Sequence, residues 1–338
     1  MEKRKIMSLG RSSLVISLPK HWVKLNELNR GDVVSVAVQR DHSLVVFPGA
    51  EKKKIPKKIT LYVDPNETEA LIVRSIIACY LNGYSGIRLI SKKMFSVAQQ
   101  KAIRHIVGVL YMRIMESDAK SMYIQTLIDE SKASVVSGIR RMHLISSSMY
   151  RDALNALKDQ DAKLARAVYS LDDDVDHFSF FILRLLRSAS FDPALASQLD
   201  LEPLDCLDYQ TLVHRVEHVA DHAASIAKHI IMLEGRGQKI SDSLLKLILT
   251  AGKEAFNSYN KAVEAFFSKG VENSDKIIEE QKRIEKLDLE IASRSFLTEK
   301  NAAVICATCS IRDSVKRIAE YAADIAEITI NRFYKIGS

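Results

Sequence analysis

Two pairs of carboxylates stand four residues apart in segments that are otherwise rich in apolar residues. Asp172 and Asp176 form the first pair, and Glu217 and Asp221 form the second. Residues four apart lie on the same side of a helix. Ionised carboxylates leave water only when a cation or a hydrogen-bond donor compensates them. Four oxygen-bearing side chains on two packed helices could therefore bind a metal ion. The alternative is a set of solvated acids that make only local helix contacts.

The helices that must carry these acids are predicted by the spacing of apolar residues. Residues 213–232 show one broad apolar face at about 100° per residue, with the second acidic pair at its border. This face consists of Val216, Val219, Ala220, Ala223, Ile226, Ala227, Ile230 and Ile231. A partner helix is predicted within 164–186, where the first acidic pair shares a strip with Ala165, Phe180 and Leu183.

The helical pattern occurs twice along the chain. Residues 125–332 are predicted to be almost entirely helical, with one break at 191–193 and another at 235–237. Within this region, residues 216–227 align with 315–326, which indicates an internal repeat of about one hundred residues. Two such repeats predict two three-helix bundles related by pseudo-twofold symmetry.

The second repeat departs from the acidic pattern. The alignment places Gln281 opposite Asp172, Glu285 opposite Asp176, Lys316 opposite Glu217 and Glu320 opposite Asp221. A lysine at a ligand position argues against a second identical metal cluster. Glu320 and Asp324 leave a displaced site open, but ion pairs of Glu320 with Lys316 or Arg317 fit the helical spacing better.

Two acidic pairs on separate helices, followed by a similar pair of helices, resemble the phosphate-uptake regulator family PhoU. The resemblance implies tandem three-helix bundles whose E/D-xxx-D pairs hold metal ions at the bundle surface. It implies a divalent or trivalent ion, with iron, zinc and magnesium as candidates, bound by Asp172, Asp176, Glu217 and Asp221. It also implies a role in phosphate uptake, with a phosphate transporter ATPase or a sensor protein as a partner.

Composition is typical of a soluble, multidomain protein. The chain has 338 residues, of which 47% are hydrophobic and 27% charged, and this length favours two or three domains. No apolar run approaches the roughly eighteen residues of a membrane span, and the N-terminus lacks the apolar region of a signal peptide. We therefore expect a cytoplasmic protein. The four cysteines are too few and too scattered for a disulfide framework.

Positive charge is concentrated at the front of the chain. Residues 1–58 contain 13 lysines and arginines but only 5 acids, whereas the other 280 residues have a net charge of −1. A basic module followed by a nearly neutral one indicates a polyanionic partner for the first part only. That partner is either nucleic acid or an acidic membrane surface.

The same front module is predicted to form strands around one short helix. Strands are predicted over 14–18, 33–38 and 43–47, and Pro19 suits the start of a helix over 20–28. The module resembles the AbrB/SpoVT swapped-hairpin DNA-binding family. The resemblance rests on the basic start, the Leu9-Gly10-Arg11 turn, the Leu18-Pro19 step and the Gly31-Asp32 turn.

This second resemblance implies an intertwined homodimer that presents basic side chains to DNA, namely Arg4, Lys5, Arg11 and Lys20. Dimerisation is also physically sensible, because so few short elements cannot close a core alone. The module departs from the compact family pattern at Ser12 and Ser13, which lengthen the segment after the turn. A module that dimerises without contacting DNA is the alternative.

Between the basic front and the helical region lies a predicted α/β connector. Helices are predicted over 67–81 and 96–109, a strand over 86–90, and a hairpin from 111–114 and 121–124. The resulting division is 1–48 for the front module, 49–58 for a basic linker, 59–127 for the connector, 128–236 for the first PhoU-like repeat and 237–335 for the second.

The remaining motifs indicate no enzyme. His214, His218 and His222 recur every four residues, which fits either zinc or iron ligation or a hydrophilic helix flank. Cys306 and Cys309 lie inside a helical run, so two small core residues fit better than a redox pair. No glycine-rich phosphate loop, G-x-S-x-G or HExxH motif occurs.

Together, the two resemblances imply a DNA-binding regulator of phosphate uptake with a metal-binding helical domain. The alternative is an interaction subunit that regulates a membrane phosphate transporter or its sensor without binding DNA. An iron or zinc storage or redox enzyme built on a helical bundle is a third hypothesis.

Overall fold

The computed structural model describes residues 2–10, 12–38, 42–48 and 57–335. The chain divides into two compact units, Met1–Ile55 and Pro56–Ile336, and each is described by itself. Most of the predicted basic linker, 49–56, lies outside the described residues, as does Arg11.

The first unit contains two small antiparallel sheets and one helix. Strands β1 (Met7–Leu9) and β2 (Ser13–Val15) form one sheet, β3 (Ser35–Val38) and β4 (Leu44–Phe47) form the other, and α1 (Lys20–Leu25) follows Pro19. The strands are shorter than the sequence predicted. None of the described residues in this unit is buried. Its exposed large apolar side chains are Ile6, Met7, Leu9, Leu14, Ile16, Leu25, Val33, Val36, Val38 and Leu44. One copy of this unit therefore forms no hydrophobic core from its described residues.

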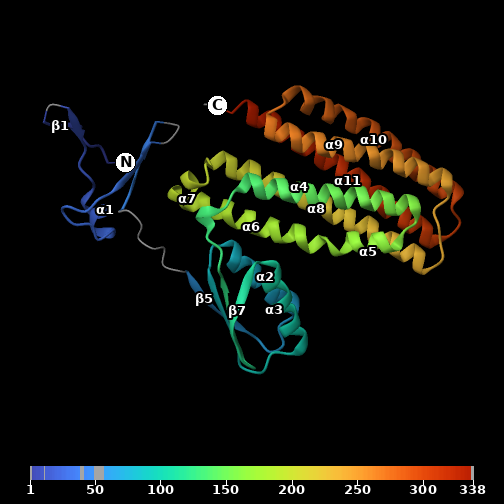
Figure 1. The fold of residues 1–338 in the computed structure, drawn as a ribbon, viewed down its shortest axis with the longest axis horizontal. Coiled ribbons are helices and arrows are strands. Elements are labelled where there is room, and N and C mark those ends of the chain that lie inside the picture. The colour runs from blue at the N-terminus through green and yellow to red at the C-terminus, as the bar shows by residue number, and fades with distance from the viewer. Residues whose placement is uncertain (1, 11, 39–41, 49–56, 336–338) are drawn as a thin grey trace. The chain divides into compact units, whose positions relative to one another are not determined.

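The second unit begins with a four-stranded sheet. In chain order it comprises β5 (Lys58–Val63), α2 (Glu69–Leu81), β6 (Gly86–Ser91), α3 (Val97–Val109), β7 (Met112–Ser117) and β8 (Ser121–Thr126). The strand order is β5-β6-β8-β7; β5 runs parallel to β6, and the other neighbouring strands are antiparallel. Helices α2 and α3 cover one face of this sheet (Figure 1). Ile72, Ile103 and Ile124 are buried between the helices and the sheet.

Strand β5 is the element of the connector that the sequence patterns did not predict. Its polar and apolar residues alternate, but it directly follows the lysine-rich segment. The Lys57 carbonyl accepts hydrogen bonds from the backbone N–H groups of Ser85 (2.9 Å) and Gly86 (3.2 Å). The end of the expected linker is therefore part of the sheet. The other predicted elements of the connector are present, with slightly shifted ends.

The rest of the second unit is helical. Its α-helices are α4 (Val135–Asp159), α5 (Ala162–Ser170), α6 (Asp172–Phe191), α7 (Pro193–Gln198), α8 (Pro203–Gly235), α9 (Asp242–Ser268), α10 (Val271–Thr298) and α11 (Ala302–Phe333). Helix α4, the α5–α6 pair and α8 pack as one three-helix bundle, and α9, α10 and α11 pack as a second. The two predicted breaks are present, but further breaks follow α4, α5, α7, α9 and α10.

The two bundles repeat the same turn after their first helix. Helices α4 and α9 both end at a non-glycine residue in the left-handed region, Gln160 (φ 56°) and Lys269 (φ 55°). Each donates its backbone N–H to the carbonyl of an alanine four positions earlier. The bundles differ in the next helix, because Leu171 separates α5 from α6 in the first copy, whereas α10 is unbroken.

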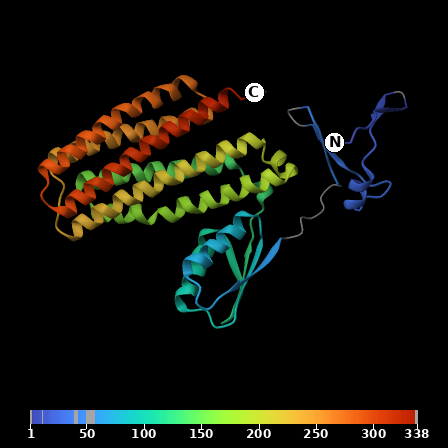
Figure 2. The same cartoon turned by 180° about the vertical axis from the view of Figure 1, so that it is seen from behind.

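The bundles pack against each other through α8 with α11 and through α4 with α9 (Figure 2). Polar contacts are buried between α4 and α9. The hydroxyl oxygens of Ser146 and Tyr259 lie 2.7 Å apart, and His143 Nε2 lies 3.0 Å from Asn260 Oδ1. No helix in the described part of the chain combines the length and apolarity that crossing a membrane requires.

A buried arginine joins the connector to the first bundle. Arg184 of α6 is only 4% exposed. Its guanidinium group donates hydrogen bonds to the Tyr80 and Tyr84 carbonyl oxygens and lies 4.7 Å from the Tyr80 ring centroid. Glu130 completes these contacts with an ion pair of 2.6 Å. Because arginine stays charged in proteins, these groups compensate a cation that has left water.

Candidate functional site

Helices α6 and α8 carry the four acids of the predicted metal site. Asp172 is the first residue of α6, and Asp176 lies one turn later. Glu217 and Asp221 lie one turn apart in the middle of α8, which packs against α6. Neighbouring residues on both helices are buried in the bundle core: Val175, Val216, Val219 and Ala220. The acids therefore lie at the edge of the core, and we call them the acidic cluster.

The carboxyl groups of the acidic cluster influence one another's protonation. Burial raises the pKa of Asp172 to about 6, that of Asp176 to about 7 and that of Glu217 to about 8. Repulsion between the acids adds to each of these pKa shifts. Burial also raises the pKa of Asp221. Among the described residues, no lysine or arginine forms an ion pair with the cluster.

The basic side chain that lies beside Glu217 is a histidine. His218 Nε2 lies 3.4 Å from Glu217 Oε2. Burial and the positive charge of Arg215 lower the pKa of His218 below its ordinary value. This imidazole is therefore mostly neutral at pH 7 and supplies little positive charge to the acidic cluster.

The chemistry of the acidic cluster fits a cation. Raised carboxyl pKa values fall when a positive ion lies beside the acids, and carboxylate oxygens are the ligands that hard cations prefer. The side chains do not converge fully, however. Over the described ranges, no group of three or more histidine, cysteine or acidic side chains is placed to hold a metal ion. The four acids are therefore close enough to repel one another, but their oxygens do not form a set of metal ligands. Metal binding stays a prediction.

The corresponding part of the second bundle is neutralised within the chain. Glu320 pairs with Lys316 at 3.6 Å and with Arg317 at 2.8 Å, as its spacing predicted. Asp324, the other acid of the suggested displaced site, pairs with Arg215 of α8 at 2.7 Å. The second bundle thus has its own cations at positions where the first bundle has unneutralised acids.

Two of the histidines of α8 pack against the second bundle. The rings of His218 and His222 lie 5.3 and 5.7 Å from that of Tyr321, and the Tyr321 hydroxyl oxygen is 3.4 Å from His222 Nε2. These contacts favour a packing role over zinc or iron ligation. The expectation that both Cys306 and Cys309 fill the core is wrong. Cys306 lies on the outer side of α11 and is exposed, and Cys309 is half-buried.

The expected DNA-binding residues all belong to the first unit. Arg4 pairs with Glu2 and donates a hydrogen bond of 3.3 Å to Ser17 Oγ. Lys5 and Lys20 are exposed. Contact of these residues with DNA therefore stays a prediction.

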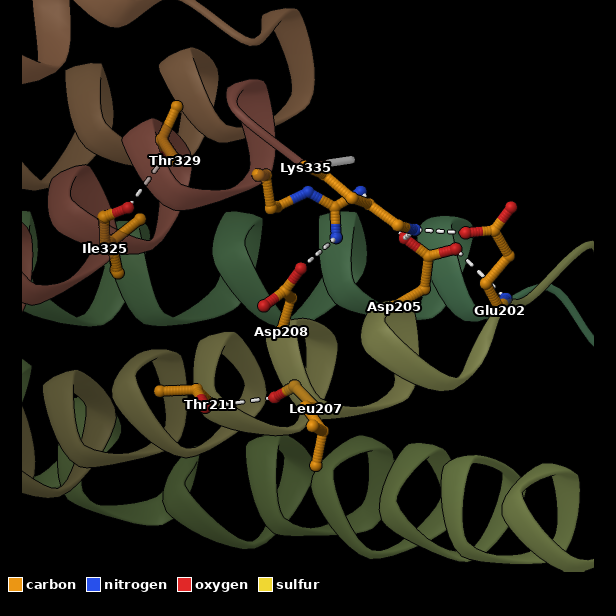
Figure 3. A network of polar contacts seen from close by, with 9 residues as sticks. Glu202, Asp205, Leu207, Asp208, Thr211, Ile325, Thr329 and Lys335 are labelled. Carbon is orange, nitrogen blue, oxygen red and sulfur yellow. Dashed lines mark hydrogen bonds and ion pairs between the residues drawn. The ribbon is translucent and has the colours of Figure 1, made fainter. Parts of the chain in front are cut away.

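The basic end of α11 meets the acidic start of α8, a contact that the sequence patterns did not predict. Arg332 lies 3.4 Å from both Asp205 and Asp208. Lys335 pairs with Glu202 and Asp205 (Figure 3). The three acids recur every three residues, which could have indicated a basic partner. The contacts fasten the third helix of one bundle to the third helix of the other.

Comparison with known proteins identifies the helical region. The family described as "PhoU domain" matches residues 139–230 and 248–329, once in each bundle. The PhoU structure from Pseudomonas aeruginosa is 22% identical, with a TM-score of 0.51, over 58% of this chain and 93% of that one. The phosphate transport system regulatory protein PhoU from Streptococcus pneumoniae is 16% identical, with a TM-score of 0.51, over 58% of this chain and 91% of that one. At such low sequence identity, the similarity to these two structures shows only that the helical region shares their fold. No curated protein sequence matches the chain.

Proposed function

The chain belongs to the PhoU domain family, and we propose that its helical region regulates phosphate uptake by contacting a phosphate transporter or its sensor. One observation carries this proposal, namely that the family match occurs in both bundles, over 139–230 and 248–329. The similar protein from Streptococcus pneumoniae is described as a regulatory protein of a phosphate transport system, which supports the same role here.

We propose that the acidic cluster makes this contact dependent on a metal ion. Asp172, Asp176, Glu217 and Asp221 would hold a divalent or trivalent cation, which supplies the positive charge that the first bundle lacks. Lys316 already supplies a positive charge in the second bundle. The metal dependence is therefore confined to one bundle.

Cells that lack this protein are expected to take up phosphate several-fold faster in phosphate-rich medium, because the inhibitory contact with the transporter is lost. Uptake of radiolabelled phosphate measures the effect. Resupplying the full-length protein should restore slow uptake. A variant with glutamine at Arg4, Lys5, Arg11 and Lys20 should restore it equally well.

The two rescue experiments separate contact with protein from contact with DNA. If only the unaltered protein restores slow uptake, regulation depends on the basic front module. If deletion leaves uptake unchanged, the proposed role in phosphate uptake is wrong.

DNA binding as a homodimer is a second candidate function, favoured by the first unit. Its large apolar side chains are exposed, and a second copy would cover them in an intertwined dimer. Residues 1–58 carry 13 basic side chains against 5 acids. The dimer would therefore present a basic surface suited to the phosphates of a DNA duplex.

Changing Arg11 and Lys20 together to alanine is expected to weaken binding to duplex DNA and leave the dimer intact. If both residues contact phosphates, the slope of log affinity against log salt should fall by about two. Fluorescence anisotropy at several salt concentrations and light scattering test these two results. Alanine at Lys276 and Lys286, two exposed positions on α10, is the matched control. Equal DNA affinity of both variants and the wild type would show that the assigned residues do not contact DNA.

A further inference from the structure

One face of the connector sheet is left open. Helices α2 and α3 pack on the opposite face (Figures 1 and 2). The side chains of Ile87, Leu89 and Met122 are buried there. Side chains alternate between the two faces of a strand. The open face therefore carries the residues between these apolar ones, and the strand register arranges them in rows. No described helix of the second unit covers it.

The rows of the open face combine basic and aromatic side chains. One row contains Lys58, Gly86, Gln125 and Arg113, and the next contains Thr60, Arg88, Tyr123 and Glu116. The third row contains Tyr62, Ile90 and Ser121. Tyr62 is 81% exposed, which is unusual for so large an aromatic side chain. Such a ring offers a flat surface on which a planar group can stack.

Tyr123, the second aromatic side chain of the open face, lies next to two positively charged side chains. The Tyr123 ring centroid lies 4.9 Å from the Arg88 guanidinium carbon and 5.8 Å from Lys58 Nζ. Among the residues that the structure describes, the Tyr123 hydroxyl has no hydrogen-bond partner. A Cβ at Gly86 would lie 2.6 Å from that hydroxyl, so the glycine makes room for the phenol. A hollow of about 290 Å³ beside Tyr123 is lined by Lys58, Ile59, Thr60, Arg88 and Glu116.

The net positive charge of the open face indicates which kind of partner it can bind. Lys58, Arg88 and Arg113 outnumber the one acid, Glu116, which pairs with Arg88 at 3.0 Å. Residues 58–126 as a whole carry nine lysines and arginines against five acids. A second copy of this face would place like charges opposite each other, which is destabilising. An anionic partner with planar groups is the better match.

We propose that the open face of the β5-β6-β8-β7 sheet binds single-stranded nucleic acid. A base stacks on Tyr62, and Lys58 and Arg113 contact the phosphates. Unpaired bases offer their flat faces to aromatic side chains, whereas the bases of a duplex are already stacked on one another. This surface consists of other residues than the front module and the acidic cluster, so substitutions on it leave the residues of both unaltered.

Replacing Tyr62 with alanine in the full-length protein tests the proposal. The probes are labelled oligothymidine and oligouridine of about 16 nucleotides, together with a duplex of the same length. Affinity for at least one single strand is expected to fall at least about fivefold, the effect of losing one stacked base. Affinity for the duplex should not change. Because Tyr62 is highly exposed, the variant should fold normally, and circular dichroism checks this.

Matched controls locate the binding surface. Tyr169→Ala removes an exposed tyrosine from α5 and should leave single-strand affinity unchanged. Glutamine at Lys58 and Arg113 should reduce the salt dependence of single-strand binding, because two phosphate contacts are lost. The proposal is overturned if the wild type binds neither single strand at low salt. It is also overturned if Tyr62→Ala binds both strands as tightly as the wild type.

Discussion

Replacing Arg184 with methionine is expected to lower the free energy of unfolding of the second unit by about 3 kcal/mol. Methionine fills similar space but leaves Glu130 and the Tyr80 and Tyr84 carbonyl oxygens without their shared donor. Removing one partner of a buried ion pair typically costs about 3–5 kcal/mol. Glu130 is partly exposed, so the lower end of this range applies. Urea-induced unfolding followed by circular dichroism measures the difference.

Arg187 provides the matched control for Arg184. It lies one turn further along α6 and also bonds to the connector, at the Leu81 carbonyl and Asn82, but it is exposed. Arg187→Met should therefore cost less than about 1 kcal/mol. Adding Glu130→Gln to Arg184→Met should recover part of the loss, since it removes the unpaired charge. Equal stability of the Arg184 and Arg187 variants would contradict the assigned role of Arg184.

The metal-free protein is expected to lose stability as the pH rises from about 4 to about 8. The carboxyl pKa values of the acidic cluster are higher in the folded than in the unfolded chain. The folded state thus binds more protons in this range, and its stability falls as those protons leave. One pKa unit is worth about 1.4 kcal/mol. Because these acids are partly exposed, we expect a total loss of about 2 kcal/mol. Thermal unfolding with chelator at several pH values measures it.

Asparagine at Asp176 and Asp221 should reduce this pH dependence and stabilise the metal-free protein at pH 8. It keeps the side-chain shape and eliminates two of the repelling charges. Added metal should raise the melting temperature of the wild type, further at higher metal concentration, and the variant should lose this response. If the wild type ignores chelator and holds no stoichiometric metal, the metal hypothesis is wrong.

The second bundle supplies the matched control for the acidic cluster. Glu285 and Glu320 occupy the positions equivalent to Asp176 and Asp221. Glutamine at both should not stabilise the protein, because Glu320 is already paired with Lys316 and Arg317. A gain equal to that of the first-bundle variant would show that the two bundles do not differ electrostatically.

Local contacts were predictable from the sequence, whereas contacts between distant segments were not. The partners of Glu320 lie three and four positions before it, so helical spacing alone indicates the pairs. Arg184 meets Tyr84 from 100 positions away, and Arg332 meets Asp208 from 124 positions away. Such contacts depend on how the elements pack, which periodicity does not specify.

The candidate site shows the same division. One-turn spacing predicted that each acidic pair shares a helix side, and the structure places the two pairs on packed helices, near enough for their charges to repel. How closely the oxygens approach depends on where α6 begins. That start is set by the break at Leu171, which neither proline nor glycine signals in the sequence. Strand β5 escaped prediction for a related reason, since its pairing with β6 depends on the intervening helix.

Helix α6 carries both the acids Asp172 and Asp176 and the buried Arg184. One continuous helix therefore links the acidic cluster to the connector. Asp176 and Arg184 are eight residues apart, so they are separated by about 12 Å along the helix axis. No flexible loop lies between them to absorb movement. An axial shift of α6 caused by a change of charge at the acids would therefore also move Arg184, which donates hydrogen bonds to the Tyr80 and Tyr84 carbonyl oxygens. The sheet that we propose to bind nucleic acid would then move with the helix that carries two residues of the proposed metal site.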